Sequence, residues 1–146
     1  MDVVVYETVG VGQAEVEITD ACDTTLVVVN PGWGDAVQAA KAGLMEIADV
    51  FVVNKADRAG AQDSVRELKQ MLEMSEADWK PEIVETVATK GEGIDILWGA
   101  IERHRAYQED NGLLEARRRR RIQREIKDIV AARLSGNATS NIHITD

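Results

Sequence analysis

The feature that most constrains the fold of this sequence is an alternation of short apolar runs with longer stretches of helical spacing. Four runs are rich in β-branched residues and bounded by turn residues: Val3–Tyr6, Thr25–Val29, Val50–Val53 and Ile83–Val87. Three further stretches have the spacing of amphipathic helices: Ala36–Ile47, Gln62–Met74 and Ile94–Tyr107. Strands that are apolar on both faces and alternate with helices are typical of a parallel sheet covered by helices. We therefore predict an α/β fold with a parallel sheet within residues 1–110.

The chain changes character after Gly112. Residues 113–134 are predicted to form one long helical arm, with an apolar stripe made of Leu114, Ile122, Ile126, Ile129 and Val130. Residues 1–112 hold 9 Lys/Arg against 22 Asp/Glu, whereas residues 113–134 hold 8 basic against 3 acidic residues. The acidic body and the basic arm can therefore attract each other, within one chain or between two. Residues 135–146 are small and polar, and we expect them to be disordered or extended.

Composition argues against several classes of function. No apolar run approaches the roughly 20 residues of a membrane-spanning helix, and the single cysteine, Cys22, favours a reducing cytoplasm. The basic run Arg117–Arg121 surrounds its helix instead of lining one face, and no aromatic residues interleave with it, which argues against nucleic-acid binding. His104 and His143 lack metal-ligand spacing with Cys22.

The most specific motif is Asn54-Lys55-Ala56-Asp57, which directly follows the predicted strand at 50–53. A carboxylate at the carboxyl end of a parallel strand faces the ligand crevice. Asp57 can accept hydrogen bonds from both N1–H and the exocyclic amine of guanine, a donor pair that adenine lacks. Asn54 can brace the loop and reach the base, and the stem of Lys55 can cover the purine face. The motif predicts guanine recognition; a coincidental polar turn is the alternative.

The end of the next strand supplies a second piece of such a site. Thr86-Val87-Ala88 lies about thirty residues downstream, and the backbone N–H of Ala88 can donate to guanine O6. Gly91 and Gly93 allow a tight turn before the following helix. Alone this segment is weakly specific, but it supports the first motif.

Near the start of the chain, Glu7 and Gly10 follow the first apolar run. At this place GTPases carry an acidic residue that contacts Mg²⁺ through water, followed by a glycine whose N–H lies near the γ-phosphate. We therefore predict a phosphate-sensing segment here, although Glu in place of Asp is unusual.

Several longer strings together resemble one family. They are Glu-Thr-Val-Gly-Val-Gly-Gln-Ala-Glu at 7–15, Asn-Pro-Gly-Trp-Gly-Asp at 30–35, Gln-Ala-Ala-Lys-Ala-Gly at 38–43, Met-Glu-Ile-Ala-Asp at 45–49 and the Asn-Lys-Ala-Asp motif. The chain resembles the MeaB/ArgK-type P-loop GTPases, chaperones of adenosylcobalamin-dependent methylmalonyl-CoA mutase, from residue 2 to about residue 130.

The resemblance implies roles for individual residues. Glu7 and Gly10 match the Mg²⁺ and γ-phosphate switch, with Gln13 in the same segment, so these three are the expected catalytic residues. Asp35 and Lys41 match a further switch that signals the nucleotide state to the mutase. The resemblance also implies GTP or GDP with Mg²⁺ as ligands, and an arm at 113–134 that dimerises.

One family motif does not occur in these 146 residues: the phosphate-binding loop Gly-x-x-Gly-x-Gly-Lys-Ser/Thr. In related folds the strand before that loop lies between the strands equivalent to Val3–Tyr6 and Thr25–Val29. We expect these two strands either to pair differently here or to have their gap filled by another segment.

Three hypotheses follow. The first is part of a GTP-hydrolysing chaperone of a B12-dependent mutase, with little or no hydrolysis by these residues alone. The second, from a different class, is a non-catalytic chain that keeps remnants of the guanine loops and docks or dimerises through its helical arm. The third is a truncated gene product whose missing half lies upstream or on another chain.

Overall fold

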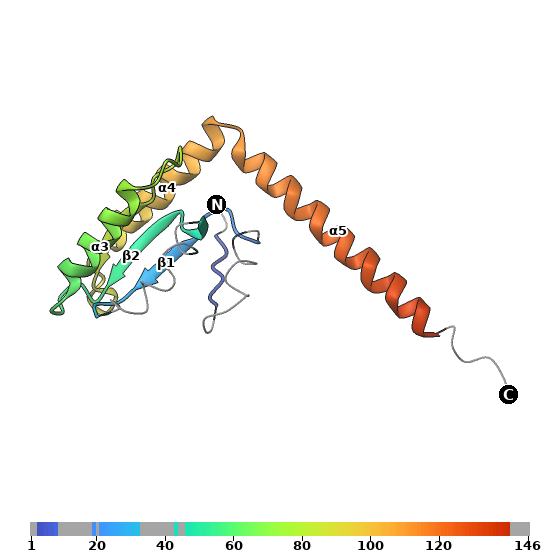
Figure 1. Cartoon of the computed structure of the whole chain (residues 1–146), viewed down its shortest axis with the longest axis horizontal. Helices are drawn as coiled ribbons and strands as arrows, with labels where there is room; N and C mark the ends of the chain where they lie inside the picture. Colours follow the sequence, from blue (N-terminus) through green and yellow to red (C-terminus); the bar gives the residue numbers. More distant parts are fainter. Residues whose placement is uncertain (1–2, 9–18, 20, 33–42, 44–45, 141–146) are drawn as a thin grey trace.

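The computed structural model describes residues 3–8, 19, 21–32, 43 and 46–140 of the chain. Within them the elements are β1 (Leu26–Val29), β2 (Val50–Asn54), α3 (Ala61–Glu73), β3 (Glu82–Thr86), a 3₁₀ turn (Ala88–Lys90), α4 (Ile94–Asp110) and α5 (Leu113–Ser140). Figure 1 shows α3 and α4 beside the sheet, whereas α5 projects away from this body.

The strands form a parallel sheet in the order β1-β2-β3. Leu26 is paired with Val50 at the start of the β1–β2 register, and Asn54 with Thr86 at the end of the β2–β3 register. The α/β fold with a parallel sheet is therefore confirmed. Three of the four predicted strands are present, each shifted by a residue at most.

The two faces of the sheet are covered by different helices. Val27, Val29, Phe51 and Val53 point to the face covered by α3, where they form a buried cluster with Val65, Leu68 and Met71. On the opposite face, Val50 and Val84 pack against Ala100 of α4. Because β2 is buried on both faces, its sequence reads as an unbroken apolar run.

On the α4 side, β1 is only partly covered. Leu26 and Val28 share a face with Val50 and Val52 through the β1–β2 register. Their side chains are nevertheless 37% and 51% exposed, because α4 packs against β2 and β3. This half of the sheet therefore leaves apolar surface in contact with solvent.

The prediction of a buried strand at Val3–Tyr6 is wrong. These residues form no strand, and their side chains are between 56% and 85% exposed. The apolar run identifies a segment that favours burial, but a strand also needs a neighbour to pair with. Within the described residues the sheet ends at β1, and Figure 1 shows residues 3–8 as an irregular trace.

Helix predictions are mostly confirmed. α3 and α4 coincide with the predicted 62–74 and 94–107 within one to three residues, whereas most of the predicted helix at 36–47 lies outside the described residues. The arm helix continues to Ser140, so the expectation of a disordered or extended segment is wrong for residues 135–140. Once a long helix has formed, each added residue gains a backbone hydrogen bond without a new nucleation step.

Candidate functional site

The first predicted motif begins at the last residue of β2. Asn54 ends the strand, and Lys55 has a φ of 58°, in the left-handed region, which turns the chain sharply. The turn is held by two backbone hydrogen bonds, from Ala56 N to the Thr86 carbonyl and from Arg58 N to the Lys55 carbonyl, both at 3.0 Å. Lys55 and Asp57 are exposed at the carboxyl edge of the sheet, where ligands of parallel α/β proteins bind.

The second predicted motif forms a closed loop after β3. Val87 donates its N–H to the Glu92 carbonyl at 3.0 Å, and Lys90 donates to the Val87 carbonyl at 2.9 Å. Gly93 closes this loop with a φ of 77°, and a Cβ at that position would lie 2.2 Å from the Glu85 carbonyl oxygen. Only glycine fits there, because the backbone passes too close to β3 for any side chain.

Asn54 joins the two loops. Its side-chain oxygen accepts hydrogen bonds from the Thr86 hydroxyl at 3.3 Å and from the Ala88 backbone N–H at 3.2 Å. The structure thus brings all six residues predicted for guanine recognition to one edge of the sheet: Asn54, Lys55, Asp57, Thr86, Val87 and Ala88. The Ala88 N–H that we expected to donate to guanine O6 has a partner in this structure, so a bound base would share or replace that bond.

A second connection between the loops involves the carboxylate expected to read the base. Lys90 Nζ lies 3.2 Å from Asp57 Oδ2, and the hydrogen bond to Asp57 raises the pKa of Lys90 above its usual value. Both side chains are about half exposed, so this ion pair is weak and easily replaced. Sequence reasoning missed Lys90, although its place two residues after Ala88 was a usable signal.

The remaining predicted site residues are only partly described. Glu7 lies in the irregular, exposed segment 3–8, whereas Gly10, Gln13, Asp35 and Lys41 lie outside the described residues. No group of three or more potential metal ligands occurs in the described part of the chain. A Mg²⁺ ion that is bound mainly by nucleotide phosphates and water needs only one or two carboxylates. The single exposed carboxylate of Glu7 fits that donor set but does not form a metal site by itself.

A buried polar cluster lies at the opposite edge of the sheet, where the strands begin. Asp49 Oδ2 accepts hydrogen bonds from the Thr25 N–H at 2.8 Å and from Arg117 at 3.2 Å, and Asp49 Oδ1 lies 3.2 Å from His104 Nε2. His104 Nδ1 lies 2.9 Å from the Thr24 hydroxyl. Since the carboxylate only accepts, the His104 ring donates from Nε2 to Asp49.

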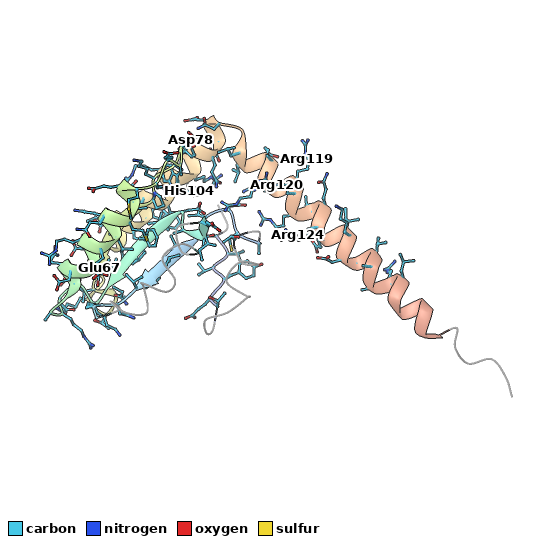
Figure 2. All side chains as sticks on the ribbon, viewed as in Figure 1. Glu67, Asp78, His104, Arg119, Arg120 and Arg124 are labelled. Atoms are coloured by element: carbon cyan, nitrogen blue, oxygen red, sulfur yellow. The ribbon has the colours of Figure 1, made fainter. Side chains whose placement is uncertain are left out.

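Burial alone would raise the pKa of Asp49, and it is the largest single influence. The hydrogen bond from His104, the positive charges of His104 and Arg117 and the Thr25 N–H together outweigh burial and lower this pKa. The cluster therefore holds an ionised carboxylate. Figure 2 shows His104 between α4 and the sheet, so the cluster joins these two elements to α5.

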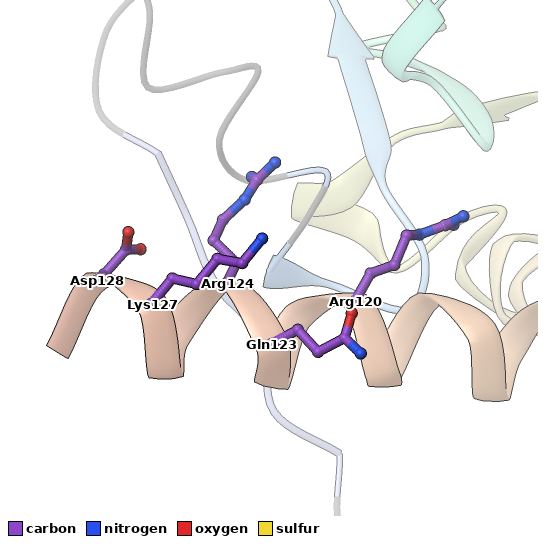
Figure 3. A pocket seen from close by; sticks show the side chains of 5 residues that line it. All are labelled: Arg120, Gln123, Arg124, Lys127 and Asp128. Carbon is purple, nitrogen blue, oxygen red and sulfur yellow. The ribbon is translucent and has the colours of Figure 1, made fainter. Parts of the chain in front are cut away.

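A shallow polar cleft lies on α5, away from both loops. It is lined by Arg120, Gln123, Arg124, Lys127 and Asp128 (Figure 3). No residue of the two predicted guanine loops lines it, and its lining comes from one helix. We therefore locate the candidate site at the carboxyl edge of β2 and β3, not in this cleft.

Comparison with a solved structure identifies the fold to which the sheet belongs. The chain is similar to a structure described as a LAO/AO transport system kinase, with a TM-score of 0.72 and 24% identity over 92% of this chain and 45% of that one. The parallel sheet therefore forms part of a P-loop NTPase fold.

Comparison of sequences defines the particular family. Residues 1–143 match the family described as methylmalonyl Co-A mutase-associated GTPase MeaB. The chain belongs to this family, and its resemblance to the MeaB/ArgK GTPases is confirmed.

Relatives of known name differ in their sequence identity to this chain. A Pyrococcus abyssi protein named as a GTPase is 49% identical over 97% of this chain and 45% of its own length. The GTPase ArgK of Escherichia coli is 38% identical over 68% of this chain and 32% of its own length. The mouse protein named methylmalonic aciduria type A homolog, mitochondrial, is 33% identical over 80% of this chain and 30% of its own length. The chain thus spans less than half the length of these curated relatives. Among the described residues, no helix combines the length and apolarity needed to cross a membrane.

Proposed function

We propose that this chain supplies the base-recognition half of a GTP-binding site in a chaperone of an adenosylcobalamin-dependent mutase of the methylmalonyl-CoA mutase type. The observation that carries the proposal is the joining of the two loops by Asn54, whose side-chain oxygen bonds both Thr86 and Ala88. This arrangement presents the Asp57 carboxylate next to the 86–88 loop, where a guanine ring can meet both. Membership of the MeaB family supports guanine nucleotides and a mutase partner.

Asp57 would distinguish guanine from adenine. Its exposed carboxylate is an acceptor of two hydrogen bonds and matches the adjacent N–H donors of guanine. Lys55, held in the left-handed conformation, would place its aliphatic stem over the base. These residues bind and orient the base; none of them acts on the phosphates.

Glu7, Gly10 and Gln13 are proposed to respond to the phosphates, and Asp35 and Lys41 to report the nucleotide state to the mutase. When bound, Mg²⁺ supplies charge neutralisation at the phosphates, and Glu7 would contact it through water. No Gly-Lys-Ser/Thr loop occurs in the 146 residues. That loop provides most phosphate contacts in P-loop proteins, so we expect weak nucleotide binding and no detectable hydrolysis by this chain assayed alone.

The arm is proposed to form a homodimer. Ile122, Ile126, Ile129, Val130 and Leu134 are between 49% and 66% exposed on α5. Five such residues at helical spacing form an apolar stripe of the kind that pairs with a second helix. The lone Cys22 supports a reducing compartment, and we place the protein in the cytoplasm.

Titration of the chain with a fluorescent GDP analogue, with ATP and GTP as competitors, tests base recognition. We expect GTP to compete at least about tenfold better than ATP, because adenine lacks the donor pair that Asp57 accepts. Asp57→Ala should abolish this preference. Asp63→Asn, which changes an exposed carboxylate of α3, is the matched control and should leave it intact.

Equal competition by ATP and GTP would remove the guanine assignment. GTP hydrolysis that survives purification and disappears in Asp57→Ala would contradict the expected inactivity of the chain. A chain that binds no nucleotide but forms dimers would favour the non-catalytic hypothesis.

A further inference from the structure

The junction between the body and α5 has few restraints from packing. α4 ends at Asp110 and α5 begins at Leu113, with Gly112 between them at a φ of 67°. A Cβ added at Gly112 would meet no atom within 4 Å, so no other part of the body packs against this side of the residue, and its backbone N–H donates to the Glu109 carbonyl at 3.1 Å. Among the described side chains of α5, only Leu114 is a buried apolar residue.

Polar contacts take the place of apolar packing on the next two turns of α5. Arg118 donates to both carboxylate oxygens of Asp23, at 2.6 Å to Oδ2 and 3.4 Å to Oδ1, and Arg121 donates to the same carboxylate. Arg121 also donates to the Ala21 carbonyl at 2.7 Å. We call Asp23, Arg118 and Arg121 the Asp23 cluster.

Arg117 adds a second connection on the same side of the helix. It donates to the Asp23 carbonyl at 2.9 Å and to the Asp49 carboxylate at 3.2 Å. Arg119 lies on the opposite side: it is exposed, and Figure 2 shows it turned away from the sheet. The arginine run is thus divided by function, with Arg117, Arg118 and Arg121 fastening the helix to the body.

The contacted segment directly precedes the sheet. Residues 21–25 lead directly into β1. Thr25 and Asp49 exchange backbone and side-chain hydrogen bonds at 3.0 and 2.8 Å. The Asp23 cluster therefore fastens α5 to the start of β1, far along the sequence from the hinge at Gly112.

The attachment of α5 to the body should be stronger than a fully exposed ion pair and weaker than a buried one. The ion pairs are half-buried, with Asp23 36%, Arg118 43% and Arg121 33% exposed. Exposed pairs contribute little, but several charges in one network with bidentate geometry contribute more. Such an attachment can be broken without unfolding the apolar core, which does not include these residues.

We propose that α5 turns as a rigid helix about Gly112 and that the Asp23 cluster holds it in one docked orientation, so that loss of the cluster releases the arm while the body stays folded. The cluster would then control where the apolar stripe at 122–134 points. This inference concerns the chain itself and does not depend on nucleotide binding or on dimerisation.

Pulsed electron–electron double resonance measures the orientation of the arm. Spin labels are placed on exposed positions of α3 and α5, as Lys69→Cys and Ala131→Cys in a Cys22→Ala background. Dilution with unlabelled protein restricts the signal to distances within one chain. We expect one narrow distance distribution for the parent chain.

Asp23→Asn and Arg118→Gln should each broaden that distribution and lower the ratio of docked to released molecules by about fivefold or more, because a charge-assisted network is lost. Arg119→Gln removes the same charge from the opposite side of the same helix and should leave the distribution unchanged. Far-UV circular dichroism should show an unchanged helix content in all variants.

The exchange Asp23→Arg with Arg118→Asp should restore part of the docked distance. A distribution in Asp23→Asn that equals that of the parent chain would overturn the proposal. It would also be overturned if Arg119→Gln broadened the distribution as much as Arg118→Gln, since the effect would then come from net charge.

Discussion

Asp49→Asn is the substitution whose effect on stability follows most directly from the structure. Asp49 is 15% exposed in its side chain and faces His104 and Arg117, which are 3% and 20% exposed. Asparagine has nearly the same shape but carries no charge and presents an amide donor. The change therefore leaves a half-buried arginine and a buried histidine facing a neutral group.

The magnitude follows from the contacts that remain. Removing one partner of a buried ion pair costs about 3–5 kcal/mol. The amide oxygen can still accept from Thr25, and Arg117 keeps the Asp23 carbonyl, so we expect a loss of about 2–3 kcal/mol in the free energy of unfolding. With a urea m-value of about 2 kcal/mol per molar, the unfolding midpoint should fall by about 1 M.

The same carboxylate makes the free energy of unfolding of the wild-type chain depend on pH in a predictable way. The pKa of Asp49 is lowered in the folded state, so its contribution to stability is fully present above the unfolded pKa of about 3.9 and is lost as pH falls through the folded pKa. Urea unfolding between pH 3 and 7 should therefore show a shallower decline in Asp49→Asn than in the parent. The pKa values of Asp23 and Glu82 are also lowered by arginine partners. Stability should therefore still depend on pH in both the parent chain and Asp49→Asn.

Glu73→Gln is the matched control for this experiment. Glu73 is an exposed acid in the last turn of α3, where a negative charge gains nothing from the helix dipole. Its replacement should change the free energy of unfolding by less than about 0.5 kcal/mol. If Asp49→Asn lost no more than Glu73→Gln, the buried cluster would not stabilise the fold and the reasoning would fail.

Three further substitutions test other parts of the molecule. Gly93→Ala should destabilise the fold by at least about 2 kcal/mol in urea unfolding, because its Cβ would overlap the Glu85 carbonyl; a stable variant would mean that the loop shifts easily. Lys90→Ala should tighten binding of the fluorescent GDP analogue by about threefold, because the base would no longer compete with an exposed ion pair; weaker binding would show that Lys90 contacts the nucleotide. Ile126→Asp should convert the proposed dimer to a monomer in light scattering, since the stripe would carry a charge at its centre; an unchanged dimer would place the interface elsewhere.

Local sequence patterns predicted most of the secondary structure. The β-branched runs at 25–29, 50–53 and 83–87 are strands within a residue, because a strand buried between neighbours needs apolar side chains on both faces. The same pattern failed at Val3–Tyr6. Apolar side chains indicate that a segment favours burial, but a strand also needs a neighbour to pair with. In the described sheet β1 is the edge strand, and residues 3–6 do not pair with it.

Sequence motifs predicted which residues form the base-recognition loops, but not how the two loops contact each other. The spacing of Asn54 and Thr86 indicated two strand ends on one edge, and the parallel register pairs these two residues. The hydrogen bond from Ala88 to Asn54 and the ion pair between Lys90 and Asp57 depend on where each loop begins relative to the end of the neighbouring strand. Spacing along the chain does not contain that information.

The sequence by itself determined the α/β alternation, the family and the residues expected to read a guanine base, because each depends on short strings and their order. Only the tertiary structure decided where the basic arm goes. The opposite charges of body and arm allowed contact within one chain or between two, and the structure shows Arg117, Arg118 and Arg121 on Asp23 and Asp49 of the same chain. These partners are separated by 68 to 98 residues. The turn at Gly112 between α4 and α5 and the parallel register of β1 and β2 bring them together, and both are properties of the folded chain.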